Sequence, residues 1–275
     1  MNIGFIGAGN MANSLIRGLI NDGAPAETVW ATDIDNGKLD QLAGELGIKP
    51  GSSESLATHC DVLVLAVKPQ VMQAVATALH GELRAAGRSS PPLIVSIAAG
   101  ITIGHLQHWL GNDVPIIRCM PNTPALIGCG ATGMIANEFV SKEARTLAES
   151  ITSSVGVSLW MESEQDIDAV TALSGSGPAY FFLFMEAMQE AAVELGLEQD
   201  AARTLTYQTA LGAAKLALAS EESSTELRHR VTSPGGTTER AIAIFEQGGL
   251  KELVKRALKA ARDRSEELAK EVKRD

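Results

Sequence analysis

Short apolar runs alternate with helix-like stretches over the first 160 residues, and this alternation limits the possible folds more than any other feature of the chain. The run "VLVLAV" holds no polar residue and is typical of a strand buried on both faces. Amphipathic stretches at residues 11–21 and 38–46 separate the early runs. The pattern predicts βαβ units and an α/β fold with a mainly parallel, doubly wound sheet. The predicted strands are residues 3–6, 29–32, 62–66, 93–97, 116–119, 133–136 and 157–160.

After residue 160 the strand pattern stops, and the rest of the chain is predicted to be helical. Residues 164–196 form an apolar helical region interrupted by Gly-Ser-Gly-Pro, and between Asp168 and Glu194 its only charged residues are Glu186 and Glu190. A helix that is this apolar must be enclosed by other parts of the protein, and a domain of about 110 residues has few residues with which to enclose it. We therefore expect a second copy of the chain to cover it; a compact helical domain without a partner is the alternative.

The net charge of the chain is −10, which argues against nucleic acid and anionic membranes as partners because both select basic faces. The longest apolar run, residues 179–185, is far shorter than the roughly 20 residues that span a bilayer. A strand pattern begins almost at Met1, so we expect no signal peptide.

The cysteines and two neighbouring histidines give no sign of a metal site. Cys60, Cys119 and Cys129 are odd in number and form no Cys-x-x-Cys pair, which favours reduced, partly buried thiols in a cytoplasmic protein. His105 and His108 lie three residues apart without acidic or thiol ligands nearby in the sequence. A solvated helix face is the favoured interpretation of this pair, and no metal is predicted.

The first predicted strand ends in a glycine turn, "IGFIGAGNMA". Gly7 permits a tight turn, Gly9 lets the backbone approach a pyrophosphate, and Ala12 leaves room for helix and strand to pack. The second strand ends at Asp33, twenty-one residues beyond Ala12, close to the ~20 expected for an acid that binds the adenosine ribose. The turn therefore predicts a bound dinucleotide. A carboxylate repels a 2′-phosphate, so Asp33 favours NAD over NADP, although Lys38 could reach the same place.

Six motifs in order make the chain resemble the pyrroline-5-carboxylate reductase family: "GFIGAGNMA", "LAVKPQ", "VSIAAGIT", "RCMPNTPAL", "LSGSGPAYFF" and "TSPGGTTERAI". The resemblance spans nearly the whole chain. It implies an N-terminal Rossmann domain that binds the dinucleotide, residues 1–160, and a C-terminal all-helical domain for dimerisation and substrate binding, residues 161–275. It also implies NAD(P)H-dependent reduction of 1-pyrroline-5-carboxylate to L-proline, the last step of proline biosynthesis, by a homodimer that can assemble into a decamer.

The resemblance assigns site residues position by position. Two departures, Asp33 in place of a small hydroxyl residue and Ser53 in place of asparagine against the adenosine, weaken the case for a strict NADPH preference. Glu164, Gly236, Thr237 and Thr238 match positions around the substrate. The cofactor positions are Gly7, Ala8, Gly9, Asn10, Met11, Ala66, Val67, Lys68, Pro69, Ala98 and Ala99.

The segment "SPGGTT", which begins at Ser233, is the second functional candidate in its own right. Gly235 and Gly236 can adopt positive φ and present consecutive N–H groups, while Thr237 and Thr238 open the next helix. Such a cradle can bind a substrate carboxylate, with the Thr238 hydroxyl as the catalytic group beside the ring nitrogen. An ordinary helix cap is the alternative.

The chemistry expected of the site asks little of a protein acid. A protonated imine already carries the positive charge that attracts a hydride, whereas a carbonyl needs a proton as its alkoxide develops. Related two-domain hydroxyacid dehydrogenases use a lysine on the helix that begins the second domain. No lysine occurs here between residues 143 and 214, which disfavours that mechanism.

Ser176 is expected to line the substrate pocket. Asn122 is either a polar wall near the nicotinamide or a turn-stabilising residue, and Glu164 contacts the substrate amine or is an exposed helix-start acid.

Two rival functions stay open at this point. One is an enzyme that reduces another cyclic imine or a small carbonyl acid, because ring size cannot be read from a sequence. The other is a non-catalytic protein that senses nucleotides through the glycine turn, although such a protein has no use for "SPGGTT".

Overall fold

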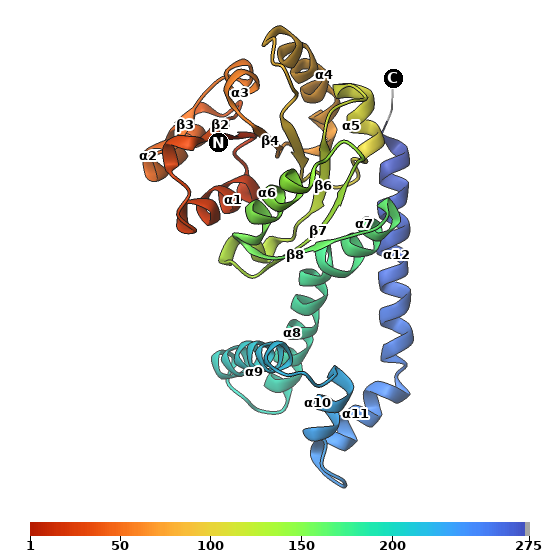
Figure 1. The fold of residues 1–275 in the computed structure, drawn as a ribbon. Coiled ribbons are helices and arrows are strands. Elements are labelled where there is room, and N and C mark those ends of the chain that lie inside the picture. Colours follow the sequence, from red (N-terminus) through yellow and green to blue (C-terminus); the bar gives the residue numbers. More distant parts are fainter. Residues whose placement is uncertain (273–275) are drawn as a thin grey trace. The chain divides into compact units, whose positions relative to one another are not determined.

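The computed structural model describes residues 1–272 and divides into two compact units (Figure 1). The first unit comprises residues 1–176 together with the described residues from 261 onward, and the helical unit comprises residues 177–260. The boundary expected between residues 160 and 161 separates the cofactor-binding domain from the domain for dimerisation and substrate binding, and it stays a prediction.

The first unit is built on one eight-stranded sheet with the order β3-β2-β1-β4-β5-β6-β7-β8. Successive strands are added on one side of β1 up to β3 and on its other side from β4 onward, which makes the sheet doubly wound, as predicted. Neighbouring strands are parallel except β6 and β7, which pair antiparallel. The bounds are β1 (Ile3–Ile6), β2 (Val29–Thr32), β3 (Lys49–Pro50), β4 (Val62–Leu65), β5 (Leu93–Ser96), β6 (Ile116–Met120), β7 (Gly130–Ala136) and β8 (Gly156–Trp160).

Helices cover both faces of this sheet, and two separate clusters of buried side chains form the core. Strand β4 shows the arrangement most directly, because Val62 and Val64 belong to one cluster while Leu63 and Leu65 belong to the other. The helices α1 (Asn10–Asn21), α2 (Asn36–Leu46) and α6 (Lys142–Ser153) pack into the first cluster; α3 (Ser53–His59), α4 (Pro69–Ala85), α5 (Ile103–Leu110) and α7 (Glu164–Val170) pack into the second. Two short 3₁₀ helices are η1 (Ala26–Thr28) and η2 (Thr123–Ile127).

The predicted interruption at Gly-Ser-Gly-Pro is a change of helix type. After α7 the chain forms a π-helical turn, Thr171–Gly175, and then α8 begins at Gly177. The Ser176 N–H donates to the Thr171 carbonyl five residues earlier, at 2.8 Å, which is the hydrogen bond that defines this turn.

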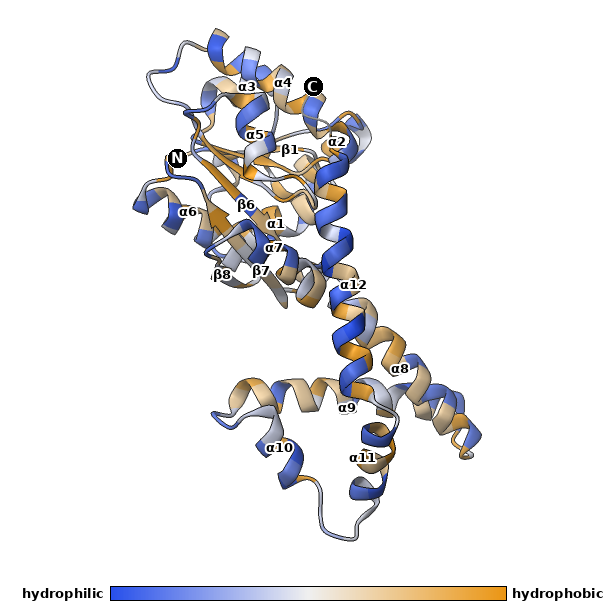
Figure 2. Cartoon of the chain, turned by 90° about the vertical axis from the view of Figure 1, so that its right-hand side faces the viewer, coloured by the Kyte–Doolittle hydropathy of each residue, from blue (hydrophilic) through white to orange (hydrophobic). Residues whose placement is uncertain are grey.

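The helical unit leaves much of its apolar surface open. Its helices are α8 (Gly177–Glu194), α9 (Gln199–Ala219), α10 (Ser224–Arg230), α11 (Thr237–Gln247) and the start of α12 (Leu250–Glu271). Phe181, Phe182 and Leu183 are each about two-thirds exposed, and Figure 2 shows hydrophobic residues recurring along α8 and α9. Apolar surface of this extent requires a cover in water. Within residues 1–272, no helix is long and apolar enough to cross a bilayer.

One expectation about α5 is wrong. His108 is exposed, as a solvated helix face requires, but His105 is buried and takes part in a reciprocal cap with Thr102. The Thr102 hydroxyl accepts a hydrogen bond from the His105 amide at 3.2 Å, and the His105 ring accepts one from the Thr102 amide at 3.2 Å. His105 therefore stabilises the start of the helix.

Candidate active site

The glycine turn after β1 has two glycines with different structural requirements. Gly7 has φ +102°, and a Cβ built on it would lie 2.6 Å from the Ala66 carbonyl oxygen. The fold itself therefore requires glycine at this position. Gly9 has φ −69°, and a Cβ there would meet no atom of the described chain within 4 Å. No packing within the described chain requires glycine at position 9, which is the arrangement expected where a ligand approaches the backbone.

Asp33 lies beside this turn, as the spacing predicted. One of its carboxylate oxygens accepts a hydrogen bond from the Ala8 N–H at 2.6 Å, and the other accepts one from the Asp35 N–H at 2.8 Å. Lys38 is engaged by Asp35, 3.3 Å away, and the Lys38 amide and ammonium group hold the pKa of Asp35 below its usual value. Two carboxylates therefore stand at the end of β2, and the nearby lysine already has a partner.

The other predicted cofactor segments follow β4 and β5. Ala66, Val67 and Lys68 connect β4 to α4, Pro69 is the first residue of α4, and Ala98 and Ala99 follow β5. Because β1, β4 and β5 are parallel, their carboxyl ends share one edge of the sheet with the glycine turn. Asn10 and Met11 form the first turn of α1 at the same edge.

Ser53 is occupied within the protein. It is the first residue of α3, after the N-cap Ser52, and its hydroxyl donates to the Glu82 carboxylate on α4. Its predicted contact with adenosine stays a prediction.

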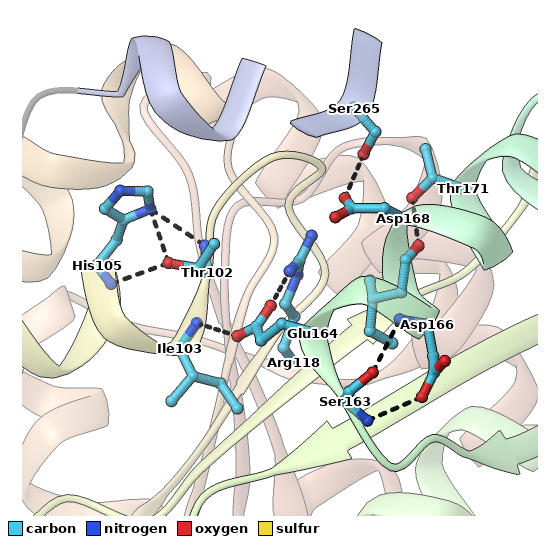
Figure 3. A network of polar contacts seen from close by, with 11 residues as sticks. Thr102, Ile103, His105, Arg118, Ser163, Glu164, Asp166, Asp168, Thr171 and Ser265 are labelled. Carbon is cyan, nitrogen blue, oxygen red and sulfur yellow. Dashed lines mark hydrogen bonds and ion pairs between the residues drawn. The ribbon is translucent and has the colours of Figure 1, made fainter. Parts of the chain in front are cut away.

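Glu164 belongs to a polar network in the first unit (Figure 3). It opens α7, and its carboxylate accepts a hydrogen bond from the Ile103 N–H at 2.7 Å and forms an ion pair with Arg118. The Arg118 side chain is only 2% exposed, whereas that of Glu164 is 32% exposed. Both Glu164 oxygens thus have partners within the chain. Its predicted contact with the substrate stays a prediction.

A second buried contact in Figure 3 joins α7 to the last turns of α12. The Ser265 hydroxyl donates to the Asp168 carboxylate at 2.7 Å, and both residues are buried. Glu164, Asp168, Thr102 and His105 also line a cavity of about 700 Å³ in this unit. Sequence reasoning missed Arg118, Asp168 and Ser265, because their partners lie 46 and 97 residues away.

The segment "SPGGTT" forms the loop before α11 and the first two residues of that helix, in the helical unit. Gly235 has the predicted positive φ, +72°, but the same prediction is wrong for Gly236, which has φ −80° and serves as the N-cap of α11. An N-cap residue takes extended backbone angles, which explains the difference.

Two amides of the expected cradle are already engaged. The Gly235 N–H donates to the Glu239 carboxylate at 2.7 Å, and the Gly236 N–H donates to the Ser233 carbonyl at 3.0 Å. No side chain among residues 1–272 caps α11, so its first amides, at Thr237 and Thr238, are the donors left for an anion.

The comparisons with known proteins cover both units. Residues 2–100 match the model described as NADP oxidoreductase coenzyme F420-dependent, and residues 164–268 match the one described as pyrroline-5-carboxylate reductase dimerisation. The chain is 52% identical over 271 residues to the pyrroline-5-carboxylate reductase of Pseudomonas aeruginosa, covering 98% of this chain and 97% of that protein. The chain belongs to the pyrroline-5-carboxylate reductase family.

Solved structures of family members agree in fold. A pyrroline-5-carboxylate reductase from Coxiella burnetii is 46% identical and superposes with a TM-score of 0.93, covering 98% of each chain. A pyrroline carboxylate reductase from Plasmodium falciparum, solved with NADP bound, is 30% identical and reaches 0.83 over 98% of each chain. These matches confirm the fold predicted from the motifs, a Rossmann-type sheet followed by a helical dimerisation domain.

Membership in the pyrroline-5-carboxylate reductase family also accounts for the open apolar surface on α8 and α9, because the dimerisation match spans both helices. Within the described residues, no group of three His, Cys, Asp or Glu could hold a metal ion; the absence of a metal stays a prediction. Burial raises the pKa of the Cys60 and Cys119 thiols to about 12. These two cysteines are therefore poor nucleophiles at neutral pH.

Proposed function

We propose that this protein reduces 1-pyrroline-5-carboxylate to L-proline with NAD(P)H. The geometry that carries the cofactor-binding part of the proposal is the contrast within the glycine turn, where Gly7 is required by the fold and Gly9 faces space that a ligand can fill. The enzyme is an NAD(P)-dependent oxidoreductase of the pyrroline-5-carboxylate reductase family. Membership in that family indicates the imine as the substrate and proline biosynthesis as the pathway.

The carboxyl edge of the sheet is the proposed cofactor site. The bound dinucleotide supplies the hydride for the reduction. Asp33 would accept hydrogen bonds from the ribose hydroxyls, and the amides that open α1 would meet the pyrophosphate. The residues proposed to hold the cofactor are Gly7, Ala8, Gly9, Asn10, Met11, Asp33, Ser53, Ala66, Val67, Lys68, Pro69, Ala98 and Ala99. Both ends of the Asn122 carboxamide have partners within the chain, so direct contact between Asn122 and the nicotinamide is not proposed.

NADH is the proposed preferred cofactor. Asp33 and Asp35 place two negative charges at the end of β2, and Lys38 is paired with Asp35. A ribose 2′-hydroxyl suits this environment, whereas a 2′-phosphate would be repelled. The NADP seen in the Plasmodium falciparum structure is a property of that protein.

The proposed substrate groups act by positioning. The Thr237 and Thr238 amides at the start of α11 would hold the substrate carboxylate. Each charge-assisted hydrogen bond would contribute about 1.5–3 kcal/mol to the binding free energy. The Thr238 hydroxyl would orient the ring nitrogen, which needs no strong acid because the protonated imine is already electrophilic. The further residues proposed for the substrate site are Glu164, Ser176, Ser233, Gly235 and Gly236.

The first prediction tests the reaction itself. Purified protein, supplied with 1-pyrroline-5-carboxylate and either NADH or NADPH, is expected to oxidise the cofactor and form proline, with the higher kcat/KM for NADH. Absorbance of the reduced cofactor gives the rate, and chromatography identifies the product. A panel of larger cyclic imines and small keto acids is the control. Oxidation of neither cofactor with the five-membered imine would disprove the function, and a higher kcat/KM for NADPH would disprove the proposed preference.

The second prediction concerns Thr238. Thr238→Ala is expected to lower kcat by about 10- to 100-fold, because misplacement of the reacting groups by about 1 Å has that effect. NADH binding, followed by fluorescence titration, should not change. Thr237→Ala is the matched control, since it also removes a hydroxyl from the first turn of α11 but leaves both backbone amides. Equal rates for the two variants and the wild-type protein would remove the Thr238 hydroxyl from the mechanism.

The proposed assembly is a homodimer, and such dimers are proposed to assemble into a decamer. The dimerisation domain and the open apolar surface of the helical unit support the dimer. We place the enzyme in the cytoplasm, because Cys60, Cys119 and Cys129 are all free thiols, as a reducing compartment favours.

A further inference from the structure

The π-helical turn Thr171–Gly175 lies at the carboxyl edge of the sheet, where the cofactor is proposed to bind. A Cβ built on Gly175 would lie 2.7 Å from the methyl carbon of Met120, the last residue of β6. Strand β6 is parallel to β5, so its carboxyl end shares the edge with the glycine turn. A π turn is a rare form of helix that is frequently found at functional sites, so the contacts made by this turn bear on the site.

Asn122 provides such a contact. It follows β6, and its side-chain NH₂ donates to the Ser174 carbonyl of the π turn at 3.1 Å. Its side-chain oxygen accepts a hydrogen bond from the Ala131 N–H on β7 at 2.9 Å. The residue is 9% exposed, so both ends of its carboxamide are engaged away from bulk water. One side chain thus joins the π turn to β7 beyond the end of β6.

Asn137 makes the same kind of link at the opposite end of the β6–β7 pair. Its side-chain oxygen accepts a hydrogen bond from the Ile116 N–H at 3.1 Å, and its NH₂ donates to the Val114 carbonyl at 2.9 Å. It is 7% exposed. The two asparagines therefore make similar contributions to the antiparallel pair. They differ in the third segment that each holds, which for Asn122 is the π turn and for Asn137 is the approach to β6.

We propose that Asn122 is a positioning residue, which fixes the π turn against the cofactor edge and so determines where Ser176 is presented to the substrate. Ser176 follows the π turn directly and is bonded to it through Thr171. Asn122 then acts on the reduction through the turn and not through contact with the nicotinamide. This inference rests on the proposed function.

The test compares Asn122→Asp with Asn137→Asp. Aspartate has the shape of asparagine and still accepts the amide hydrogen bond, but its carboxylate cannot donate to a carbonyl. Both variants are expected to lose similar thermal stability. Only Asn122→Asp is expected to lower kcat for the imine, by about 10- to 100-fold, while the Kd of NADH stays at its wild-type value. Steady-state kinetics at saturating NADH and fluorescence titration of NADH give the two quantities separately.

Three results would overturn the proposal or its basis, and they differ. If the wild-type protein does not reduce the imine, the proposed function fails. If the wild type is active and Asn122→Asp matches Asn137→Asp in kcat, the positioning role fails. If the Kd of NADH rises as much as kcat falls, Asn122 is a cofactor contact instead. Should Asn122→Asp not fold, Asn122→Ala and Asn137→Ala, which remove the hydrogen bonds without adding a charge, are compared in the same way.

Discussion

Glu164→Gln is expected to lower the free energy of unfolding by about 3 kcal/mol or more, because it leaves the Arg118 guanidinium buried without a counter-charge. Arg118 is 2% exposed, and its second terminal nitrogen has no hydrogen-bond partner in the described chain. Glutamine can still accept the hydrogen bond from the Ile103 amide. The loss therefore reports on the ion pair. Urea denaturation at one fixed protein concentration measures it, since association also contributes to stability.

The double variant Arg118→Met with Glu164→Gln supplies the control for this prediction. Methionine removes the buried charge and fills much of the arginine stem, so the double variant should be more stable than Glu164→Gln alone. If both variants unfold at the same urea concentration, the Arg118–Glu164 pair does not stabilise the fold in the way we infer. A change in stability of less than about 0.5 kcal/mol in Glu164→Gln, the range typical of surface substitutions, would contradict it as well.

The same double variant bears on the predicted substrate role of Glu164. Once stability is restored, a remaining rise in the KM for the imine reports direct contact between residue 164 and the substrate. Wild-type kinetics in the double variant would instead assign Glu164 to the fold alone. The two roles that the sequence left open for this residue are thereby separated by one protein.

Features that depend on neighbours in the sequence could be predicted. The residues of β1 and β2 follow from their apolar runs, and the proximity of Asp33 to the glycine turn follows from the regular length of a βαβ unit. Strand β3 was missed because it has two exposed residues, one of them a proline, and so carries no apolar pattern. His105 had a readable signal, since Thr102 precedes it at the spacing of a reciprocal cap.

Features that depend on distant partners could not be predicted. Arg118 lies inside the apolar run "IIRCM", and only the fold reveals that Glu164, 46 residues away, neutralises it. The Ser265–Asp168 hydrogen bond joins residues 97 apart. The dual engagement of Asn122 also required the structure, because Ser174 reaches it only through the π turn. In the "SPGGTT" loop, local glycine chemistry was read correctly for Gly235 but not for Gly236, whose position as N-cap sets its backbone angles.

A large loss of cofactor affinity is predicted at the glycine turn. Variants of its two glycines separate an effect on ligand binding from an effect on folding. Gly9→Val is expected to weaken NADH binding by about 100-fold or more, because its side chain would occupy the space proposed for the pyrophosphate. Its stability should equal that of the wild type, since no atom of the described chain lies within 4 Å of a Cβ at this position. Fluorescence titration of NADH and thermal unfolding without cofactor measure the two properties.

Gly7→Ala should behave in the opposite way. Its φ of +102° is unfavourable for alanine, and the added Cβ would lie 2.6 Å from the Ala66 carbonyl oxygen. Backbone strain of about 1–3 kcal/mol and overpacking of a further ~1–3 kcal/mol should therefore destabilise the protein even without cofactor. If Gly9→Val unfolds at a lower temperature while NADH binding persists, the space beside Gly9 serves the fold and not a ligand. The proposed cofactor site would then have to lie away from this turn, because both glycines would be explained by packing alone.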